Sequence, residues 1–321
     1  MPGRALLAAL ATALLLALAA CGEDGGAAGA GSPAITVVAT TTQAGALARS
    51  VGGDRVDVEQ LLAPNSDPHE YEVRPQDVKA LADAPLVIRS GGDVDEWLGG
   101  AIESAGADPR VVTLIDAVAA APGGHAHGGE DSHDEEVDPH WWQDPRNAVL
   151  AVGAIERALA EADPDGAAGY RARAREYGAG LRDLDRAVAA CWARVPPRQR
   201  KLVTTHDALG YYARRYGLEV IGAVIPSLST RGQASAGDTA ELVELIRRAR
   251  VRAVFTEHSV DAKVERAIAA ESGARVGRPL WTDALGPAGS DGATYEGSIA
   301  SNTRSLVDGV TGEPGSCSLP A

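Results

Sequence analysis

The sequence lacks several features that would assign it to common functional classes. Lys and Arg total 30 against 44 Asp and Glu, which gives a formal charge of −14 at pH 7. Because nucleic-acid binding requires clustered Lys and Arg around the phosphates, this acidic balance excludes a nucleic-acid partner. The sequence has no His-Glu-x-x-His pattern and no nucleophile motif, so nothing in it supports a hydrolase.

The one long apolar run lies at the N-terminus. Ala5 to Ala20 is almost purely Ala and Leu and follows a single positive charge at Arg4. Because this run is shorter than the roughly 20 residues that span a bilayer, it predicts a secretory signal peptide over residues 1–20. Residues 21–33 are poor in apolar side chains after Cys21 and predict a flexible tether. Removing residues 1–20 takes away only the charge of Arg4 and makes the chain one unit more negative than −14.

Cysteine is scarce, and the three that are present fall into two groups. Leu18-Ala19-Ala20-Cys21 resembles the lipobox of bacterial lipoproteins, in which the cysteine sulfur receives a diacylglyceryl group. Two acyl chains give stable anchoring, so we expect attachment to the outer face of the cytoplasmic membrane through Cys21. The alternative is an ordinary cleaved signal with an incidental cysteine. Cys191 and Cys317 are then left as an even pair in an exported protein, which favours a disulfide over two free thiols.

Short β-branched runs alternate with helical patterns in both halves of the chain. The predicted strands are residues 35–39, 56–62, 86–88, 111–115, 201–205, 220–225, 253–256 and 275–280. The predicted helices are residues 43–51, 74–84, 94–105, 208–216, 239–249, 261–272 and 294–308. Repeated βα units favour an α/β fold with mostly parallel sheets. For the helix over 261–272, we expect Ser259 or Asp261 as the N-cap and Gly273 at the C-terminal end.

Residues 146–194 contain no strand pattern. Apolar side chains recur at spacings of three and four from Ala167 to Cys191, which predicts one long helix with a single buried stripe, rising about 1.5 Å per residue. A helix of that length would act as a rigid strut between two domains. The sequence therefore predicts an N-terminal α/β domain over residues 34–145, a linking region over 146–200 and a C-terminal α/β domain over 201–321.

Three histidines and one aspartate follow predicted strands or a rigid Asp-Pro pair. His69 and His140 each follow Asp-Pro, and proline fixes the backbone before the histidine. His206 directly follows the strand over 201–205, and Asp283 follows the last predicted strand. Ligands of open α/β folds bind at the carboxyl edge of the sheet. Because these residues are 71, 66 and 77 positions apart in the chain, only two domains facing each other could bring them together.

Five motifs in a fixed order suggest a family. They are Pro68-His69-Glu70-Tyr71-Glu72, Asp138-Pro139-His140-Trp141-Trp142, Thr205-His206-Asp207-Ala208-Leu209-Gly210-Tyr211, Phe255-Thr256-Glu257 and Trp281-Thr282-Asp283. Behind a lipobox, this order resembles the metal-binding lipoproteins of bacterial ABC importers for zinc and manganese, the cluster A-I or zinc-uptake binding proteins. The resemblance implies two Rossmann-like domains joined by a long helix, and a monomer that delivers metal to an ABC permease. It also implies an interdomain metal site formed by His69, His140, His206 and Asp283.

The residue types of this set favour zinc as the transported ligand. Three imidazoles and one carboxylate suit the tetrahedral preference of Zn²⁺. Relatives that prefer manganese typically have a carboxylate at the position of His206, as a harder ion requires. A Mn²⁺ or Fe²⁺ carrier on the same fold is the alternative, and a cell-surface zinc hydrolase or an adhesin is less favoured. Four protein ligands leave no open position for a reacting water, which indicates carriage and no enzyme activity.

Other polar residues near these motifs receive separate roles. Residues 123–138 have many glycines and charges and predict a mobile loop within the first domain. Its His125, His127 and His133 could collect metal weakly, although a solvated insertion with incidental affinity is an equal alternative. Glu257 is a candidate to orient a ligand imidazole, and His258 is expected beside the site or at the surface.

Overall fold

The structure, a computed structural model, describes residues 35–119 and 137–319. The predicted signal peptide, the tether with Cys21, and His125, His127 and His133 lie outside the described residues. In the part of the chain that is described, no helix combines the length and apolarity needed to cross a membrane.

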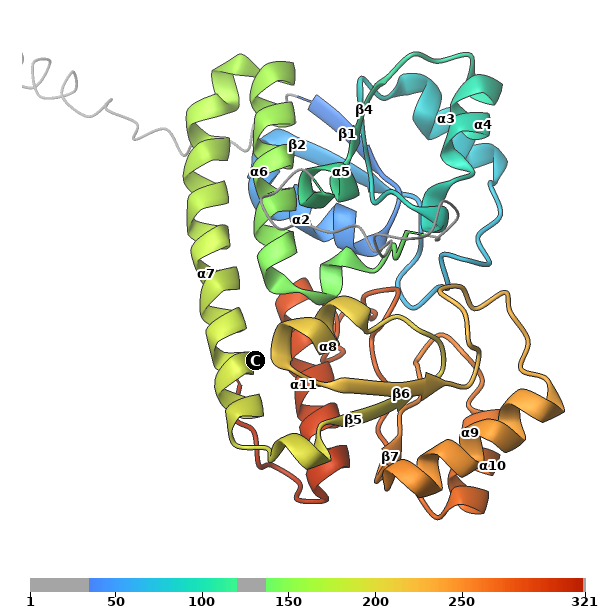
Figure 1. Cartoon of the computed structure of the whole chain (residues 1–321). Coiled ribbons are helices and arrows are strands. Elements are labelled where there is room, and N and C mark those ends of the chain that lie inside the picture. The colour runs from blue at the N-terminus through green and yellow to red at the C-terminus, as the bar shows by residue number, and fades with distance from the viewer. Residues whose placement is uncertain (1–34, 120–136, 320–321) are drawn as a thin grey trace, which may run out of the picture. The chain divides into compact units, whose positions relative to one another are not determined.

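The first half of the chain forms a four-stranded parallel sheet in the order β2-β1-β3-β4 (Figure 1). Its strands are β1 (Ile35–Ala39), β2 (Val56–Gln60), β3 (Leu86–Arg89) and β4 (Arg110–Thr113). Its helices are α2 (Thr42–Gly52), α3 (Pro75–Asp83), α4 (Leu98–Ala105) and α5 (Leu114–Ala119). The central strands β1 and β3 are almost wholly buried, as expected of parallel strands covered on both faces. The four predicted strands are confirmed in place, although the last ends at Thr113 because α5 begins at the next residue.

The connection between β3 and α4 differs from the helix predicted over residues 94–105. A 3₁₀ turn, η2 (Asp93–Asp95), comes first and α4 begins only at Leu98. The fully buried carboxylate of Asp95 accepts hydrogen bonds from the backbone N–H of Ser90 (2.6 Å) and from the Thr40 hydroxyl (2.7 Å). These bonds bend the chain back over the end of β3. They leave Asp93 just past the carboxyl end of that strand.

The second half of the chain repeats the same topology with shorter strands. Its strands are β5 (Lys201–Thr204), β6 (Glu219–Ala223), β7 (Ala253–Val254) and β8 (Arg275–Val276). They form two parallel pairs, β5 with β6 and β7 with β8, and the backbone N–H of Phe255 donates to the carbonyl of Val203 (2.8 Å) between the pairs. The resulting order β6-β5-β7-β8 matches that of the first sheet. The strand predicted over 275–280 ends early because Pro279 offers no N–H to a ladder.

Four helices accompany these strands. They are α8 (Gly210–Tyr216), α9 (Ala236–Ala249), α10 (Lys263–Ser272) and α11 (Tyr295–Thr311). All four were predicted, and Gly273 ends α10 in a left-handed conformation as expected (φ 79°). The predicted N-cap of α10 was wrong: the cap is Ala262, without a side-chain hydrogen bond. Asp261 instead pairs with Arg266 at 3.2 Å.

Two long helices connect the halves and were only partly predicted. α6 (Pro145–Ala162) was not predicted, whereas α7 (Ala167–Ala193) extends the predicted helix by two residues. The 27 residues of α7 correspond to a length of about 40 Å. α7 packs against α6 and α2 and also against α8 and α11 (Figure 1). The long helix therefore contacts both halves of the chain, as the strut prediction requires.

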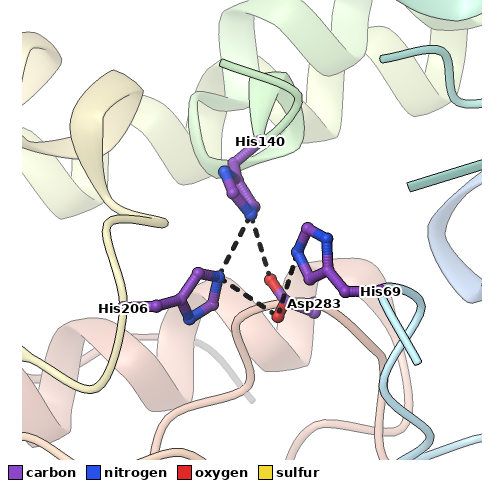
Figure 2. Close-up of side chains that lie close together, drawn as sticks. All are labelled: His69, His140, His206 and Asp283. Atoms are coloured by element: carbon purple, nitrogen blue, oxygen red, sulfur yellow. Dashed lines mark hydrogen bonds and ion pairs between the residues drawn. The ribbon is translucent and has the colours of Figure 1, made fainter. Parts of the chain in front are cut away.

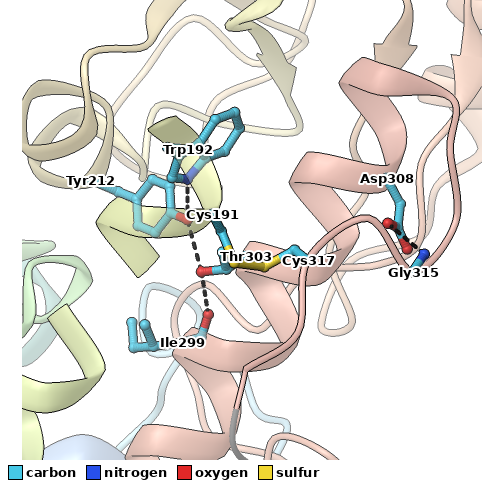
Figure 3. Close-up of a disulfide and its surroundings, with 8 residues drawn as sticks. All are labelled: Cys191, Trp192, Tyr212, Ile299, Thr303, Asp308, Gly315 and Cys317. Carbon is cyan, nitrogen blue, oxygen red and sulfur yellow. Dashed lines mark hydrogen bonds between the residues drawn. A yellow bond between two sulfur atoms is a disulfide. The ribbon is translucent and has the colours of Figure 1, made fainter. Parts of the chain in front are cut away.

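A disulfide joins the end of α7 to the segment that follows α11. Cys191 and Cys317 are both buried, and their Cα atoms are 5.3 Å apart (Figure 3). The predicted pairing is confirmed. Beside it, the Trp192 indole N–H donates to the Tyr212 hydroxyl, which is also hydrogen-bonded to Thr303 of α11 (both 2.8 Å). These contacts attach the end of α7 to the C-terminal half.

Candidate metal centre

His69 lies in the irregular segment between β2 and α3. The preceding Asp67-Pro68 pair sets its direction, because an Asp67 carboxylate oxygen accepts the backbone N–H of His69 at 2.9 Å. On the imidazole, Nδ1 lies 3.2 Å from an oxygen of Asp93, which extends from the turn after β3. The segment also contacts the other half of the chain, since the Asn65 N–H donates to the Leu285 carbonyl at 2.8 Å.

His140 is held by the aspartate two positions before it. One oxygen of Asp138 accepts both the backbone N–H of His140 (2.9 Å) and its Nδ1–H (2.8 Å). The chain then forms the 3₁₀ turn η3 (Trp141–Gln143) before Pro145 begins α6. The two tryptophans of this turn are buried and lie edge to face, and the Trp142 ring lies against His140 with ring centroids 5.4 Å apart.

His206 lies two residues past the end of β5 and is held by a carboxylate from the segment after the next strand over. One oxygen of Glu257 accepts both the His206 backbone N–H (3.2 Å) and its Nδ1–H (2.8 Å). Glu257 follows β7 and pairs with Leu280 in an isolated parallel bridge. The role predicted for Glu257, orientation of an imidazole, agrees with these distances.

Asp283 extends from the loop between β8 and α11 and is only 1% exposed. Neither of its carboxylate oxygens has a hydrogen-bond partner among the described residues. Both oxygens instead face the imidazoles: Oδ1 lies 3.4 Å from His140 Nε2, and Oδ2 lies 3.3 Å from His206 Nε2 and 3.9 Å from His69 Nε2. A buried carboxylate without donors is costly unless a cation approaches it.

The structure brings all four predicted residues into one group (Figure 2). His69, His140, His206 and Asp283 are each at most 2% exposed, and one ligand atom from each lies within 4.8 Å of the others. The Nε2 atoms of His140 and His206 are 3.3 Å apart. A tetrahedral zinc ion with bonds of about 2.0–2.1 Å sets its ligand atoms about 3.3–3.4 Å apart. The separations among His140, His206 and Asp283 fit such an ion, whereas His69 Nε2 lies farther from Asp283, at 3.9 Å.

Each of the three imidazoles has a carboxylate at Nδ1, which leaves Nε2 facing the other ligand atoms. Glu257 was predicted in this role, whereas Asp93 and Asp138 were not. The repeated Asp-Pro-His tripeptide contained the signal for Asp138. Asp93 carries no local signal, because only the fold brings the end of β3 next to His69.

These carboxylates also govern protonation. Burial lowers the pKa of His140, but Asp138 and Asp283 outweigh it and raise this pKa to about 9. Burial likewise disfavours charge on His206, yet Asp283 and Glu257 raise its pKa well above the usual range. For Asp283, burial raises the pKa, and the two imidazoles lower it well below normal. The raised pKa values favour protonated His140 and His206, so a metal that binds these imidazoles must displace their protons.

His258 does not join this group. Its ring is exposed and stacks on the indole of Trp281, with ring centroids 3.6 Å apart and planes inclined by 11°. Burial lowers its pKa, and it contributes no atom to the cluster of four. Of the two residues predicted beside the site, only Glu257 contacts one of the four.

The comparison with protein families gives one match over almost the whole described chain. The family described as zinc-uptake complex component A, periplasmic, matches residues 37–309. The chain belongs to this family. The zinc-uptake component family consists of substrate-binding components of ABC importers, which are not enzymes.

Relatives within the family are named for two different metals. The manganese-binding lipoprotein MntA of Bacillus subtilis is 32% identical over 299 residues, covering 91% of this chain and 94% of its own. The zinc-binding protein TroA of Treponema pallidum is 30% identical over 276 residues, covering 84% and 87%. The solved structure of periplasmic TroA superposes with a TM-score of 0.78 at 28% identity, covering 86% of this chain and 99% of TroA. The fold predicted from sequence is thereby confirmed.

Proposed function

We propose that this protein captures Zn²⁺ outside the cytoplasm and delivers it to the permease of an ABC importer. Family membership supports a role in metal import, and the arrangement of His69, His140, His206 and Asp283 supports a specific ligand set. The observation that carries the proposal is a buried group of three imidazoles and one carboxylate. The ligand atoms of His140, His206 and Asp283 lie 3.3–3.4 Å apart, and His69 Nε2 lies 3.9 Å from Asp283. Four protein ligands with these separations match a closed zinc site.

Manganese is the second candidate, and two observations favour it. Relatives such as MntA are named for manganese. Both oxygens of Asp283 also face ligand nitrogens, which would allow the higher coordination number of a harder ion. The third imidazole, His206, argues for zinc, because nitrogen ligands suit zinc better than manganese. Its Glu257 partner strengthens this nitrogen as a donor.

The proposed cellular setting follows from the N-terminal sequence. A lipid on Cys21 would anchor the protein as a monomer at the outer face of the cytoplasmic membrane. There it could meet the permease without entering the membrane itself. Processing at Cys21 is tested by mass spectrometry of the membrane-associated protein: a diacylglyceryl group on Cys21 is expected, and a mature N-terminus lacking Cys21 would contradict it.

Metal competition tests the proposed function. Purified metal-free protein is titrated with Zn²⁺ and with Mn²⁺, each against a chelator of known affinity, and then with both metals together. We expect one tight site that takes Zn²⁺ from an equimolar mixture. Stoichiometric Mn²⁺ retained in the presence of equimolar zinc would reject the zinc assignment and favour a manganese carrier. A His206→Glu variant serves as the matched comparison, because it should shift the preference toward Mn²⁺.

We further propose that His125, His127 and His133 bind additional zinc weakly, in several geometries. Deletion of residues 123–137 should remove the weak sites and leave the tight site unchanged, since none of the four proposed ligands lies in the deleted segment. Zinc stoichiometry by elemental analysis, before and after a mild chelator wash, measures both classes. Loss of tight binding on deletion would mean that the proposed ligand set is wrong.

A further inference from the structure

Among the described residues, the side chains of His69 and Asp283 are the two proposed ligands without a hydrogen bond, and of these only His69 has a positioning carboxylate beside it. The three imidazoles each have a carboxylate at Nδ1, whereas neither oxygen of Asp283 has a hydrogen-bond partner among the described residues. Its direction must therefore be set by the backbone from which it extends. The residues that precede it, Leu280 to Thr282, show how that backbone is fixed.

The anchors act on successive residues before Asp283. Leu280 continues the strand contacts, since its N–H donates to the Thr256 carbonyl at 2.8 Å and its carbonyl accepts the N–H of His258 at 3.1 Å. The Thr282 carbonyl accepts the indole N–H of Trp142 (2.8 Å) and the amide N–H of Gln143 (2.7 Å). The Thr282 hydroxyl donates to the second oxygen of Glu257 at 2.7 Å.

The backbone of Trp281, between Leu280 and Thr282, is held by one side chain from α11. Its backbone N–H donates to Asn302 Oδ1 at 2.8 Å, and its carbonyl accepts Asn302 Nδ2–H at 2.7 Å. Asn302 is 1% exposed and thus replaces, with one amide, the two bonds that a neighbouring strand would make. The side chain reaches the loop from the interior of a 17-residue helix, which makes it a rigid support.

Ser301, the residue before Asn302 in α11, helps to fix the side chain of Trp281 through Asp291. The indole N–H donates to Asp291 Oδ1 at 3.0 Å, and the Ser301 hydroxyl donates to Asp291 Oδ2 at 2.7 Å. A Cβ on Gly292 would come within 2.3 Å of the indole nitrogen, so the loop packs tightly around the ring. Trp281 is therefore attached to α11 through both its backbone and its side chain.

From these contacts we propose that Asn302 is a positioning residue for the metal site. It fixes the peptide of Trp281 so that Asp283, two residues later, presents its carboxylate to the imidazoles of His140 and His206. The inference rests on the proposed function, because it concerns the affinity for the same metal. It adds a residue 19 positions beyond Asp283 in the chain that no motif of the sequence indicated.

A purely structural role would produce a different result, and the chain offers a matched control. Thr303, the next residue of α11, is fully buried and its hydroxyl bonds with Tyr212 and with the Ile299 carbonyl (Figure 3). Thr303→Val removes these hydrogen bonds at a similar depth in the protein. Among the described residues, no hydrogen bond joins the Thr303 side chain to Trp281. Asn302→Leu keeps the branched shape at Cγ and removes both bonds to Trp281.

The experiment measures zinc affinity by chelator competition for the wild type, Asn302→Leu, Thr303→Val, Asp283→Ala and the double variant Asn302→Leu/Asp283→Ala. We expect Asn302→Leu to weaken zinc binding about 10- to 100-fold, the usual effect of losing an outer support, and Thr303→Val to change it less than about twofold. If Asn302 acts through Asp283, its substitution adds less than about twofold in the Asp283→Ala background, since the two effects are then not additive.

Two results would overturn the inference alone: an Asn302→Leu affinity within about twofold of wild type, or an equal loss with and without Asp283. Far-UV circular dichroism of the metal-free proteins checks folding. If Asn302→Leu does not fold, Asn302→Asp takes its place. It keeps an acceptor for the Trp281 N–H and, as a carboxylate, sets an oxygen in place of the amide donor to the Trp281 carbonyl. A loss of zinc affinity is then expected, and an unchanged affinity would overturn the inference. Absence of tight zinc binding by the wild type would overturn the proposed function and this inference with it.

Discussion

At the scale of single residues, the carboxylates beside the imidazoles determine how each histidine is positioned at the site. Asp138 and Glu257 each accept the backbone N–H and the Nδ1–H of the same histidine, so they fix the tautomer as well as the ring direction. Asp93 contacts only the ring of His69 and its side chain is 25% exposed. The three supports are therefore unequal, and their removal should have unequal effects.

Replacement of each carboxylate by its amide measures this inequality. Asp138→Asn and Glu257→Gln should each weaken zinc affinity about 10- to 100-fold, because a buried imidazole loses its charged acceptor. Asp93→Asn should have a smaller effect, since water can reach that carboxylate. Chelator competition gives the affinities, and Asp163→Asn, which removes an ion pair with Arg55 at 2.9 Å away from the site, is the control. Equal losses at all three positions would contradict this order.

The raised pKa of His140 predicts an unusual pH dependence for the metal-free protein. Its folded pKa of about 9 exceeds the ordinary value of 6.5, so its contribution to stability is complete below about pH 6.5 and is lost as the pH rises toward 9. The size of this contribution is on the order of 3 kcal/mol. Asp283 acts in the opposite direction: its lowered pKa stabilises the fold above about pH 4, and this stability is lost in acid.

Urea denaturation between pH 5 and 9.5 checks this prediction. In the presence of a chelator, the free energy of unfolding should fall from pH 6.5 to 9. The stabilisation added by saturating zinc should rise over the same window, because bound metal requires unprotonated imidazoles. The control is His140→Ala, which should remove much of the fall in unfolding free energy between pH 6.5 and 9. A metal-free protein that becomes more stable over this window would show that the imidazoles are not protonated as inferred.

The four proposed ligands were predictable from sequence because each follows a strand end or an Asp-Pro pair. His258 follows a strand end too, but its ring turns outward onto Trp281, and alternation along an extended chain could not decide between Glu257 and its neighbour. Asp93 and Asn302 were not predictable, since each reaches the site only through tertiary packing. Residues that act through another residue leave no local pattern in a single sequence.

At the scale of elements, the long helix and the disulfide belong together. α7 ends at Ala193, two residues after Cys191, and the disulfide attaches this end to the segment beyond α11. That segment is further fixed by the Gly315 N–H, which donates to Asp308 at 3.0 Å (Figure 3). The disulfide therefore attaches the C-terminal segment to a residue 126 positions earlier in the chain.

Removal of this bond should lower stability without affecting the metal site. A Cys191→Ser/Cys317→Ser variant is expected to lose about 2–5 kcal/mol of unfolding free energy, because the unfolded chain is no longer constrained. Zinc affinity should stay within about twofold, since neither cysteine contacts the four proposed ligands. Urea denaturation and chelator competition measure the two quantities, with wild type in reductant as a second comparison. A large loss of affinity would mean that the disulfide also fixes the site.

Element prediction succeeded where local pattern and packing agree. All eight strands of the described residues overlap the predicted ones. β7 and β8 have two residues each, because Pro279 offers no N–H where their pairing would continue. α6 was missed although Asp144 and Pro145 form a typical helix start, with the Asp144 side chain accepting the N–H of Arg146 at 2.9 Å. It lies in the segment predicted only as a linking region, next to the longer stripe of α7.

At the scale of the whole molecule, direct contacts already join the two halves around the site. Trp142 and Gln143 of the first half donate to the Thr282 carbonyl of the second, and the Tyr295 hydroxyl donates to the Trp142 carbonyl at 2.6 Å. Near His69, the Thr230 hydroxyl of the second half donates to Asp67 at 2.7 Å. A cation bound by His69 and His140 together with His206 and Asp283 would add bonds across the same boundary.

Zinc should therefore stabilise both halves together. At a free zinc concentration about 1,000 times the dissociation constant, a ligand that binds only the folded state adds about 4 kcal/mol. Differential scanning calorimetry should show one unfolding transition that moves to higher temperature as a unit, because the four ligand residues come from both halves. Asp283→Ala should lose most of this shift, although it keeps three imidazoles. Two transitions, of which zinc moves only one, would place the bound cation within a single half and contradict a site built between the two sheets.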